Sequence, residues 1–266
     1  MKKLLLAAVL ASACSPAAFA AAEAKNVIFF LGDGMGPTTV TAARIYKYKE
    51  EGELHMEKLD GKTRTAREKT YSKDAQTTDS APSMAAYMTG VKMNNEVLSM
   101  SADTKAIRPN GKDSACPATG NGTAVDTILE IAKAKGKSVG AVTTTTVTHA
   151  TPAATYAHIC HRDAENTIAA QAVVGGVGYN TKLGNGLDVL LGGGRTYFLP
   201  TTGVGAAKGS RTDGRDLTAE MQAKGYTYAN TGTALAAIDG KTTTKLLGLF
   251  NPSHMEYELD RVKKNI

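Results

Sequence analysis

The chain has 266 residues, a formal net charge of +6, and 42% hydrophobic and 21% charged residues. This is the composition of a globular protein, and the length suits one large domain or two small ones. Lys and Arg are spread along the chain and no nucleic-acid-binding motif occurs, so the positive charge indicates a solvated surface and no nucleic-acid partner.

Residues 1–20 have the pattern of a targeting segment. Two lysines precede an apolar run that is too short to span a bilayer, and Ala18-Phe19-Ala20 is a cleavage signal. The pattern predicts a secretory signal peptide over 1–20 and an exported mature domain over 21–266, in the periplasm or outside the cell. Lipid attachment at Cys14 is the alternative. No other apolar run is long enough for a transmembrane helix.

Cleavage after Ala20 leaves two cysteines, Cys116 and Cys160. Because exported chains meet an oxidising compartment, an even count predicts a disulfide between them. The alternative is two buried thiols. Zinc binding by this pair is disfavoured, since no CxxC spacing occurs.

The first predicted element is a buried strand over residues 26–31 that ends on Gly32-Asp33-Gly34. A helix is predicted to follow, with Pro37 in its first turn. Active sites of α/β sheets lie beyond the carboxyl ends of strands, which is where Asp33 falls. A carboxylate in a glycine loop repels a bare phosphate, so Asp33 favours a metal ligand. Alternatively, Asp33 only stabilises the turn.

The stretch QTTDSAPSMAAYMTG, residues 76–90, predicts a helix that begins near Ser80. Pro82 then lies in the first turn, where its missing N–H costs nothing. The positive end of the helix dipole faces Ser80 and any anion bound there, which suits a serine that attacks phosphorus. The alternative is that Asp79 or Ser80 only caps the helix.

A second helix is predicted over residues 123–137, with a cap formed by Thr123 and Asp126 and an end at Gly136. Strands are predicted at 138–148 and 187–194. Strands that alternate with helices predict an α/β fold with a largely parallel sheet. Residues between 201 and 245 are rich in Gly and Thr and are not assigned to elements.

The stretch from 143 to 164 runs off a strand into His149 and Thr151 and reaches Arg162. A hydroxyl and an imidazole at a strand end could help to hold a hard cation, and an arginine could fork two phosphate oxygens. Each also has a structural interpretation: a polar strand end, a cap, a surface arginine. The other histidines are interpreted as structural or surface residues: His55, His158, His161 and His254.

Five stretches resemble alkaline phosphatases, in the same order and with compatible spacing: NVIFFLGDGMG, TDSAPSMAAYMTGVK, GKSVGAVTTTTVTHATPAATYAH, DVLLGGGRTYF and LLGLF. The resemblance implies an α/β sandwich with a largely parallel central sheet flanked by helices. It also implies hydrolysis of phosphate monoesters with two Zn²⁺ and one Mg²⁺, usually by a homodimer.

The resemblance implies a role for each matching residue. Ser80 matches the serine that becomes phosphorylated, Arg162 the arginine that binds phosphate, and Asp79 the neighbour that orients this arginine. Among the metal-site residues, Asp33 matches the aspartate that bridges a zinc and the magnesium, and Thr151 matches a magnesium ligand. A further match, at residue 149, places a histidine close to the magnesium without direct coordination.

The family's later metal ligands have no match. No Asp is followed four residues later by His, and no Asp-His dipeptide occurs. The sequence therefore predicts the amino-terminal portion of an alkaline phosphatase domain, incomplete at its carboxyl end and nearly inactive alone. A non-catalytic phosphate- or metal-binding remnant is one alternative. A sulfatase- or phosphopentomutase-like enzyme is another, although Ser80 lacks the arginine of a sulfatase C/S-x-P-x-R frame.

Overall fold

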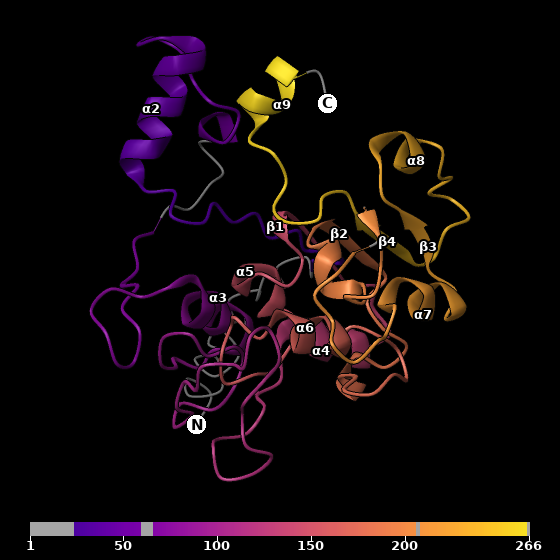
Figure 1. Cartoon of the computed structure of the whole chain (residues 1–266). Coiled ribbons are helices and arrows are strands. Elements are labelled where there is room, and N and C mark those ends of the chain that lie inside the picture. Colours follow the sequence, from indigo (N-terminus) through magenta and orange to yellow (C-terminus); the bar gives the residue numbers. More distant parts are fainter. Residues whose placement is uncertain (1–23, 60–65, 206–207, 265–266) are drawn as a thin grey trace, which may run out of the picture. The chain divides into compact units, whose positions relative to one another are not determined.

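The computed structural model describes residues 24–59, 66–205 and 208–264 (Figure 1). The predicted signal peptide over 1–20, with Cys14, lies outside these residues. The chain divides into two compact units, residues 1–61 and 62–266. None of the helices in the described ranges has the length and apolar character needed to cross a bilayer.

The first unit contains helix α2 (Pro37–Tyr48) and the short 3₁₀ helix η2 (Glu57–Leu59). Helix α2 confirms the predicted helix that starts at Pro37. It ends at Tyr48, and the next residue, Lys49, adopts a positive φ of 65°.

The predicted strand over 26–31 is wrong as a strand. The segment has no strand pairing within the described residues, and side chains such as Val27 and Phe30 are exposed. A strand is defined by ladder hydrogen bonds to a neighbour, and an apolar, β-branched sequence does not supply that neighbour. The predicted turn does form: Met35 N–H donates to Gly32 O at 3.1 Å, and Gly34 has φ 66°.

The second unit is built on a four-stranded sheet in the order β1-β2-β4-β3, and each neighbouring pair is parallel. This sheet confirms the predicted α/β class and the strands within 138–148 and 187–194. The connections between parallel strands run over helices, as such crossovers require. The strands are β1 (Gly140–Thr146), β2 (Val189–Gly193), β3 (Thr227–Ala229) and β4 (Leu246–Leu249).

Helices flank this sheet. Helix α3 contacts α5, α5 contacts β1, and α7 and α8 contact β3, as can be followed in Figure 1. The unassigned region between 201 and 245 thus supplies α7, β3 and α8. The helices are α3 (Ser80–Thr89), α4 (Ile128–Ala134), α5 (Ala150–Ala153), α6 (Glu165–Gln171), α7 (Leu217–Ala223), α8 (Gly232–Ala236) and α9 (Glu258–Lys264), with 3₁₀ helices η3 (Thr181–Leu183) and η4 (Arg195–Phe198).

Helix α4 begins later than predicted. Thr127 and Glu130 form a capping box, in which each side chain accepts from the other residue's N–H, so the predicted cap at Thr123 and Asp126 is wrong. Thr127 is buried and its hydroxyl also donates to Thr155 O at 2.8 Å. This tertiary bond favours Thr127 as the cap over the predicted residues Thr123 and Asp126. The end of the helix agrees with the prediction, since Gly136 has φ 71°.

The core contains many small side chains where α3 meets α5. Ala81 and Ala85 of α3 and Ala150 and Ala153 of α5 are fully buried. Alanines let two helices approach closely, because no long side chain separates their backbones. This packing brings the start of α3 towards the segment that follows β1.

The loop after β4 is hydrogen-bonded to β1 and to the residue that follows β2. Gly194 N–H donates to Asn251 O at 3.0 Å, and Met255 N–H donates to Thr144 O at 2.8 Å. Because parallel strands end at the same edge, this loop lies at the carboxyl end of β1.

Candidate active site

Ser80 is the first residue of α3 and Asp79 is its N-cap. Asp79 Oδ1 accepts from Ala81 N–H at 2.6 Å, and Pro82 is buried in the first turn. A capping carboxylate satisfies a helix N–H that would otherwise have no partner. Asp79 is therefore the cap that the sequence offered as an alternative, and this role fixes its carboxylate beside Ser80.

Arg162 reaches both of these residues. Its Nη1 donates to Asp79 Oδ1 at 3.1 Å and to Ser80 Oγ at 2.8 Å, and its Nη2 lies 2.9 Å from His149 Nε2. Because a guanidinium only donates, His149 Nε2 accepts and the ring proton of a neutral His149 sits on Nδ1. Ser80 Oγ also accepts, so its own proton is left to be donated elsewhere.

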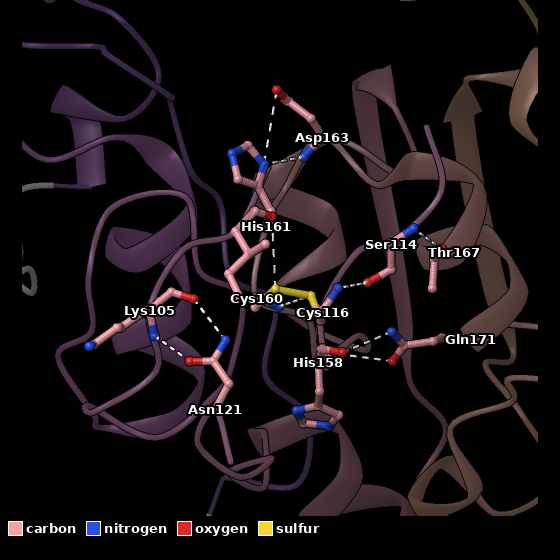
Figure 2. The surroundings of a disulfide bond; sticks show 11 residues. Lys105, Ser114, Cys116, Asn121, His158, Cys160, His161, Asp163, Thr167 and Gln171 are labelled. Atoms are coloured by element: carbon pink, nitrogen blue, oxygen red, sulfur yellow. Dashed lines mark hydrogen bonds and ion pairs between the residues drawn. A yellow bond between two sulfur atoms is a disulfide. The ribbon is translucent and has the colours of Figure 1, made fainter. Parts of the chain in front are cut away.

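The backbone around Arg162 is held by long-range contacts. Arg162 N–H donates to Glu96 O at 2.8 Å, and Glu96 N–H donates to Asp79 Oδ2 at 2.6 Å. Two residues earlier, Cys160 forms a disulfide with Cys116, which confirms the predicted pair (Figure 2). The arginine is thus tied through the main chain to the carboxylate that its own side chain contacts.

A buried carboxylate, Glu165, fixes the end of β1, and sequence reasoning did not single it out. Its Oε2 accepts from Thr146 Oγ1 at 2.9 Å and Thr148 Oγ1 at 2.8 Å. Its Oε1 lies 3.2 Å from Lys112 Nζ. These bonds hold the residues that precede His149, so Glu165 supports one side of the site.

His254 was interpreted from the sequence as structural or surface, and it is an exposed residue that lies beside His149. Its Nδ1 accepts from Thr146 N–H at 3.1 Å, and its ring lies edge-on to the ring of His149 with centroids 5.2 Å apart. The signal for this placement was the apolar strand LLGLF just before it, because a residue after a parallel strand reaches the same sheet edge as the residues after β1.

Comparison with known proteins identifies the family of this chain. A model of the alkaline phosphatase family matches residues 24–265. The chain belongs to the alkaline phosphatase family. It is 41% identical over 265 residues to the tissue-nonspecific alkaline phosphatase of Mus musculus, covering 90% of this chain and 48% of the relative. It is 41% identical over 266 residues to the alkaline phosphatase of Gadus morhua, covering 91% and 53%. The chain thus spans about half the length of the curated relatives it matches.

Solved alkaline phosphatases share the fold. The Thermus thermophilus enzyme superposes with a TM-score of 0.66 at 32% identity, covering 86% of this chain and 40% of that one. Alkaline phosphatase from the Antarctic bacterium TAB5 gives a TM-score of 0.60 at 25% identity, covering 84% and 52%. These matches confirm the predicted α/β architecture of the alkaline phosphatase family.

The second unit brings four of the six predicted site residues into direct contact: Ser80, Asp79, Arg162 and His149. A fifth, Thr151, lies in α5 two residues after the histidine. The sixth, Asp33, lies in the turn of the first unit.

The residues predicted to bind metal differ in the donor atoms that they offer. Asp33 and Thr151 offer a carboxylate and a hydroxyl, the oxygen donors that Mg²⁺ prefers. A catalytic zinc site takes about three protein ligands. Within the second unit, His149 and Thr151 offer an imidazole and a hydroxyl, and the imidazole Nε2 faces Arg162. These two residues do not make a zinc site by themselves.

Proposed function

We propose that this chain takes part in the hydrolysis of phosphate monoesters through a phosphoserine at Ser80. The observation that supports it is the single amino group of Arg162, Nη1, which contacts both Asp79 Oδ1 and Ser80 Oγ. A guanidinium beside a serine oxygen at a helix N-terminus can bind a phosphate group so that its phosphorus lies next to that oxygen.

In the proposed reaction, Ser80 Oγ attacks phosphorus and loses its proton. The ester P–O bond breaks and the leaving alcohol takes a proton. Water then attacks the phosphoserine, which restores Ser80 and releases inorganic phosphate. Splitting one displacement into two easier steps is the gain from a covalent intermediate.

Arg162 and Asp79 have distinct roles in this proposal. Arg162 binds the equatorial phosphate oxygens, where charge accumulates as the ester bond breaks. Asp79 keeps the guanidinium oriented, because its Oδ1 accepts from Nη1 while its Oδ2 is held by Glu96 N–H. When phosphate binds, it replaces the contact of Nη1 with Ser80 or of Nη2 with His149, and the contact with Asp79 remains.

We further propose, from family membership, that Thr151 is a magnesium ligand with His149 near it, and that Asp33 is a ligand of magnesium and of one of two Zn²⁺. A mutant of TAB5 alkaline phosphatase has been solved with Mg bound, and its likeness to this chain has a TM-score of 0.59. When bound, such ions would lower the pKa of hydroxyl groups and stabilise developing negative charge on oxygen.

The proposed setting is export to the periplasm or the cell exterior, and the Cys116–Cys160 disulfide supports an oxidising compartment. The proposed substrates are phosphate esters of alcohols. Assembly as a homodimer is proposed from family membership alone.

The test compares the purified chain with two serine variants of α3, Ser80→Ala and Ser83→Ala. Ser83 is the matched control, because its hydroxyl lies one turn further along and donates to Asp79 O at 3.0 Å. Each protein receives p-nitrophenyl phosphate with Zn²⁺ and Mg²⁺. Acid-quenched samples are then searched for phosphoserine by mass spectrometry. The proposal expects phosphate on Ser80, kept in Ser83→Ala, with any hydrolysis lost in Ser80→Ala.

Binding of inorganic phosphate gives a second readout that does not need turnover. Arg162→Met should weaken phosphate binding at least tenfold. Arg162→Lys should keep part of the affinity, because an ammonium supplies the positive charge but not the two parallel N–H donors of a guanidinium. Phosphate bound through Arg162 with no phosphoserine would favour the non-catalytic alternative. Equal hydrolysis by the parent chain and Ser80→Ala would refute the proposed nucleophile.

A further inference from the structure

Three side chains outside the Ser80 contacts form a separate cluster: Glu96, His161 and Asp163. One oxygen of each carboxylate and one ring nitrogen of His161 lie within 4.8 Å of one another. In the ranges that the structure describes, this is the one group of three or more His, Cys, Asp or Glu with metal-binding spacing. Asp163 is exposed, Glu96 partly buried and His161 buried.

The imidazole points to a ligand independently of the carboxylates. The side chain of His161 is only 6% exposed. Its Nδ1 accepts from Asp163 N–H at 3.2 Å and lies 4.0 Å from Asp163 Oδ2 (Figure 2). No hydrogen bond from any described residue reaches its Nε2. Because no described residue occupies Nε2, this nitrogen is available to an ion or to water.

The negative charge of the carboxylates around Glu96 also favours a bound cation. Burial raises the pKa of Glu96, the carboxylate of Asp79 adds to this, and Asp163 does so to a smaller extent. His161 and Arg162 act in the opposite direction without reversing it. The guanidinium of Arg162 already contacts three other residues through Nη1 and Nη2, so it does not form an ion pair with Glu96 alone. A bound cation would relieve this crowding of carboxylates.

We propose that Glu96, His161 and Asp163 bind a divalent transition-metal ion of the Mn²⁺ or Zn²⁺ class. One imidazole with two carboxylates suits these ions, whereas Mg²⁺ and Ca²⁺ prefer oxygen donors alone. Metal–ligand bonds of about 2.1 Å place ligand atoms at most about 4.2 Å apart. The 4.8 Å spread therefore closes by a small rotation of a side chain, and Asp163 is exposed and able to make it.

The ion would hold the segment that carries Arg162. His161 and Asp163 flank the arginine, and Glu96 is hydrogen-bonded through its main chain to both Arg162 and Asp79. A metal that joins these three side chains therefore clamps the arginine from both neighbours. None of these three residues is among those proposed to bind magnesium or zinc, and the inference does not depend on the proposed reaction.

The test counts Mn²⁺ sites on the full chain, freed of metal with a chelator, from the electron paramagnetic resonance signal of unbound Mn²⁺. Glu96→Gln and Asp163→Asn keep side-chain size and remove charge, and each should weaken one Mn²⁺ site at least tenfold. Two controls should leave that site unchanged: Glu258→Gln, an exposed carboxylate elsewhere, and Asp33→Asn, which removes a residue of the proposed magnesium site. Thermal unfolding verifies that each variant is folded.

Nuclear magnetic resonance provides the second measurement. In the ¹⁵N-labelled chain, Mn²⁺ should broaden the ring signals of His161 and the guanidinium signals of Arg162 at the concentration where the site fills. Glu96→Gln should remove this broadening. Mn²⁺ isotherms of Glu96→Gln and Asp163→Asn that superimpose on that of the parent chain would overturn the proposal, as would the absence of broadening at His161. If Glu96→Gln does not fold, the Mn²⁺ isotherm of Asp163→Asn, which changes an exposed residue, is the deciding measurement.

Discussion

Replacing Glu130 by Gln tests the buried polar network that joins α4 to the segment before Arg162. Glu130 Oε2 accepts from Thr127 N–H at 2.7 Å, and Oε1 accepts from His158 Nε2 and Asn180 Nδ2, both at 2.6 Å. His158 Nδ1 lies 2.7 Å from Ser99 O, which can only accept. Both ring nitrogens therefore donate when Glu130 is ionised, and His158 is an imidazolium paired with a buried carboxylate.

The loss in Glu130→Gln follows from these three bonds. A glutamine side chain has one accepting oxygen, and its amide group would face a donor at the other position. The variant also leaves the imidazolium without its counter-charge. Breaking a buried pair by removing one partner costs about 3–5 kcal/mol. The lost cap of α4, worth roughly 1 kcal/mol, is part of this total because the same carboxylate makes it. We expect a loss of about 3–5 kcal/mol in the free energy of unfolding at neutral pH.

Urea unfolding followed by circular dichroism measures this loss, under non-reducing conditions so that the disulfide stays closed. Glu258→Gln is the matched control, since Glu258 makes an exposed ion pair with Arg261. Exposed pairs contribute little, so the unfolding curve of this variant should superimpose on that of the parent within experimental error. A Glu130→Gln variant within 1 kcal/mol of the parent would show that His158 is neutral or that the network is not formed.

Three other outcomes are expected. Burial opposes the ionisation of Glu130, but hydrogen bonds from His158 and Asn180 and the charge of His158 lower its pKa below 4.5, so the stability difference of Glu130→Gln should persist above that pH and shrink as pH falls further. Replacing Cys116 and Cys160 by Ala should cost about 4 kcal/mol for the 44-residue separation, measured by urea unfolding. Tyr156→Phe, which removes a 2.9 Å bond to a carbonyl oxygen, should cost roughly 1–3 kcal/mol by thermal unfolding, against no change in the exposed Tyr257→Phe.

Local signals were sufficient where one short stretch contains the whole pattern. The start of α3 was predicted because a cap, a first-turn proline and a final glycine all lie within residues 76–90. The strands β1 and β2 were predicted from continuous runs of apolar or β-branched residues, which favour strands. The disulfide followed from a count of two cysteines.

The errors occurred where a distant partner decides the structure. Residues 26–31 have a strand-like composition, but composition does not provide a pairing neighbour. The start of α4 was misplaced because Thr127 is selected by its bond to Thr155, far along the chain. The contact between the rings of His254 and His149 was not predicted, since 105 residues separate the two positions and only the sheet topology brings them together.

The same reasoning explains why Arg162 can be placed so closely beside Ser80. A long side chain loses rotamer freedom when it binds, so an arginine held in advance loses less on meeting phosphate. Here the main chain is fixed two residues before the arginine by Cys160 and three residues after it by Glu165. Between them, Arg162 N–H is bonded to Glu96. The guanidinium needs little reorganisation before phosphate binds, because its backbone is fixed by these anchors and its side chain already contacts Asp79.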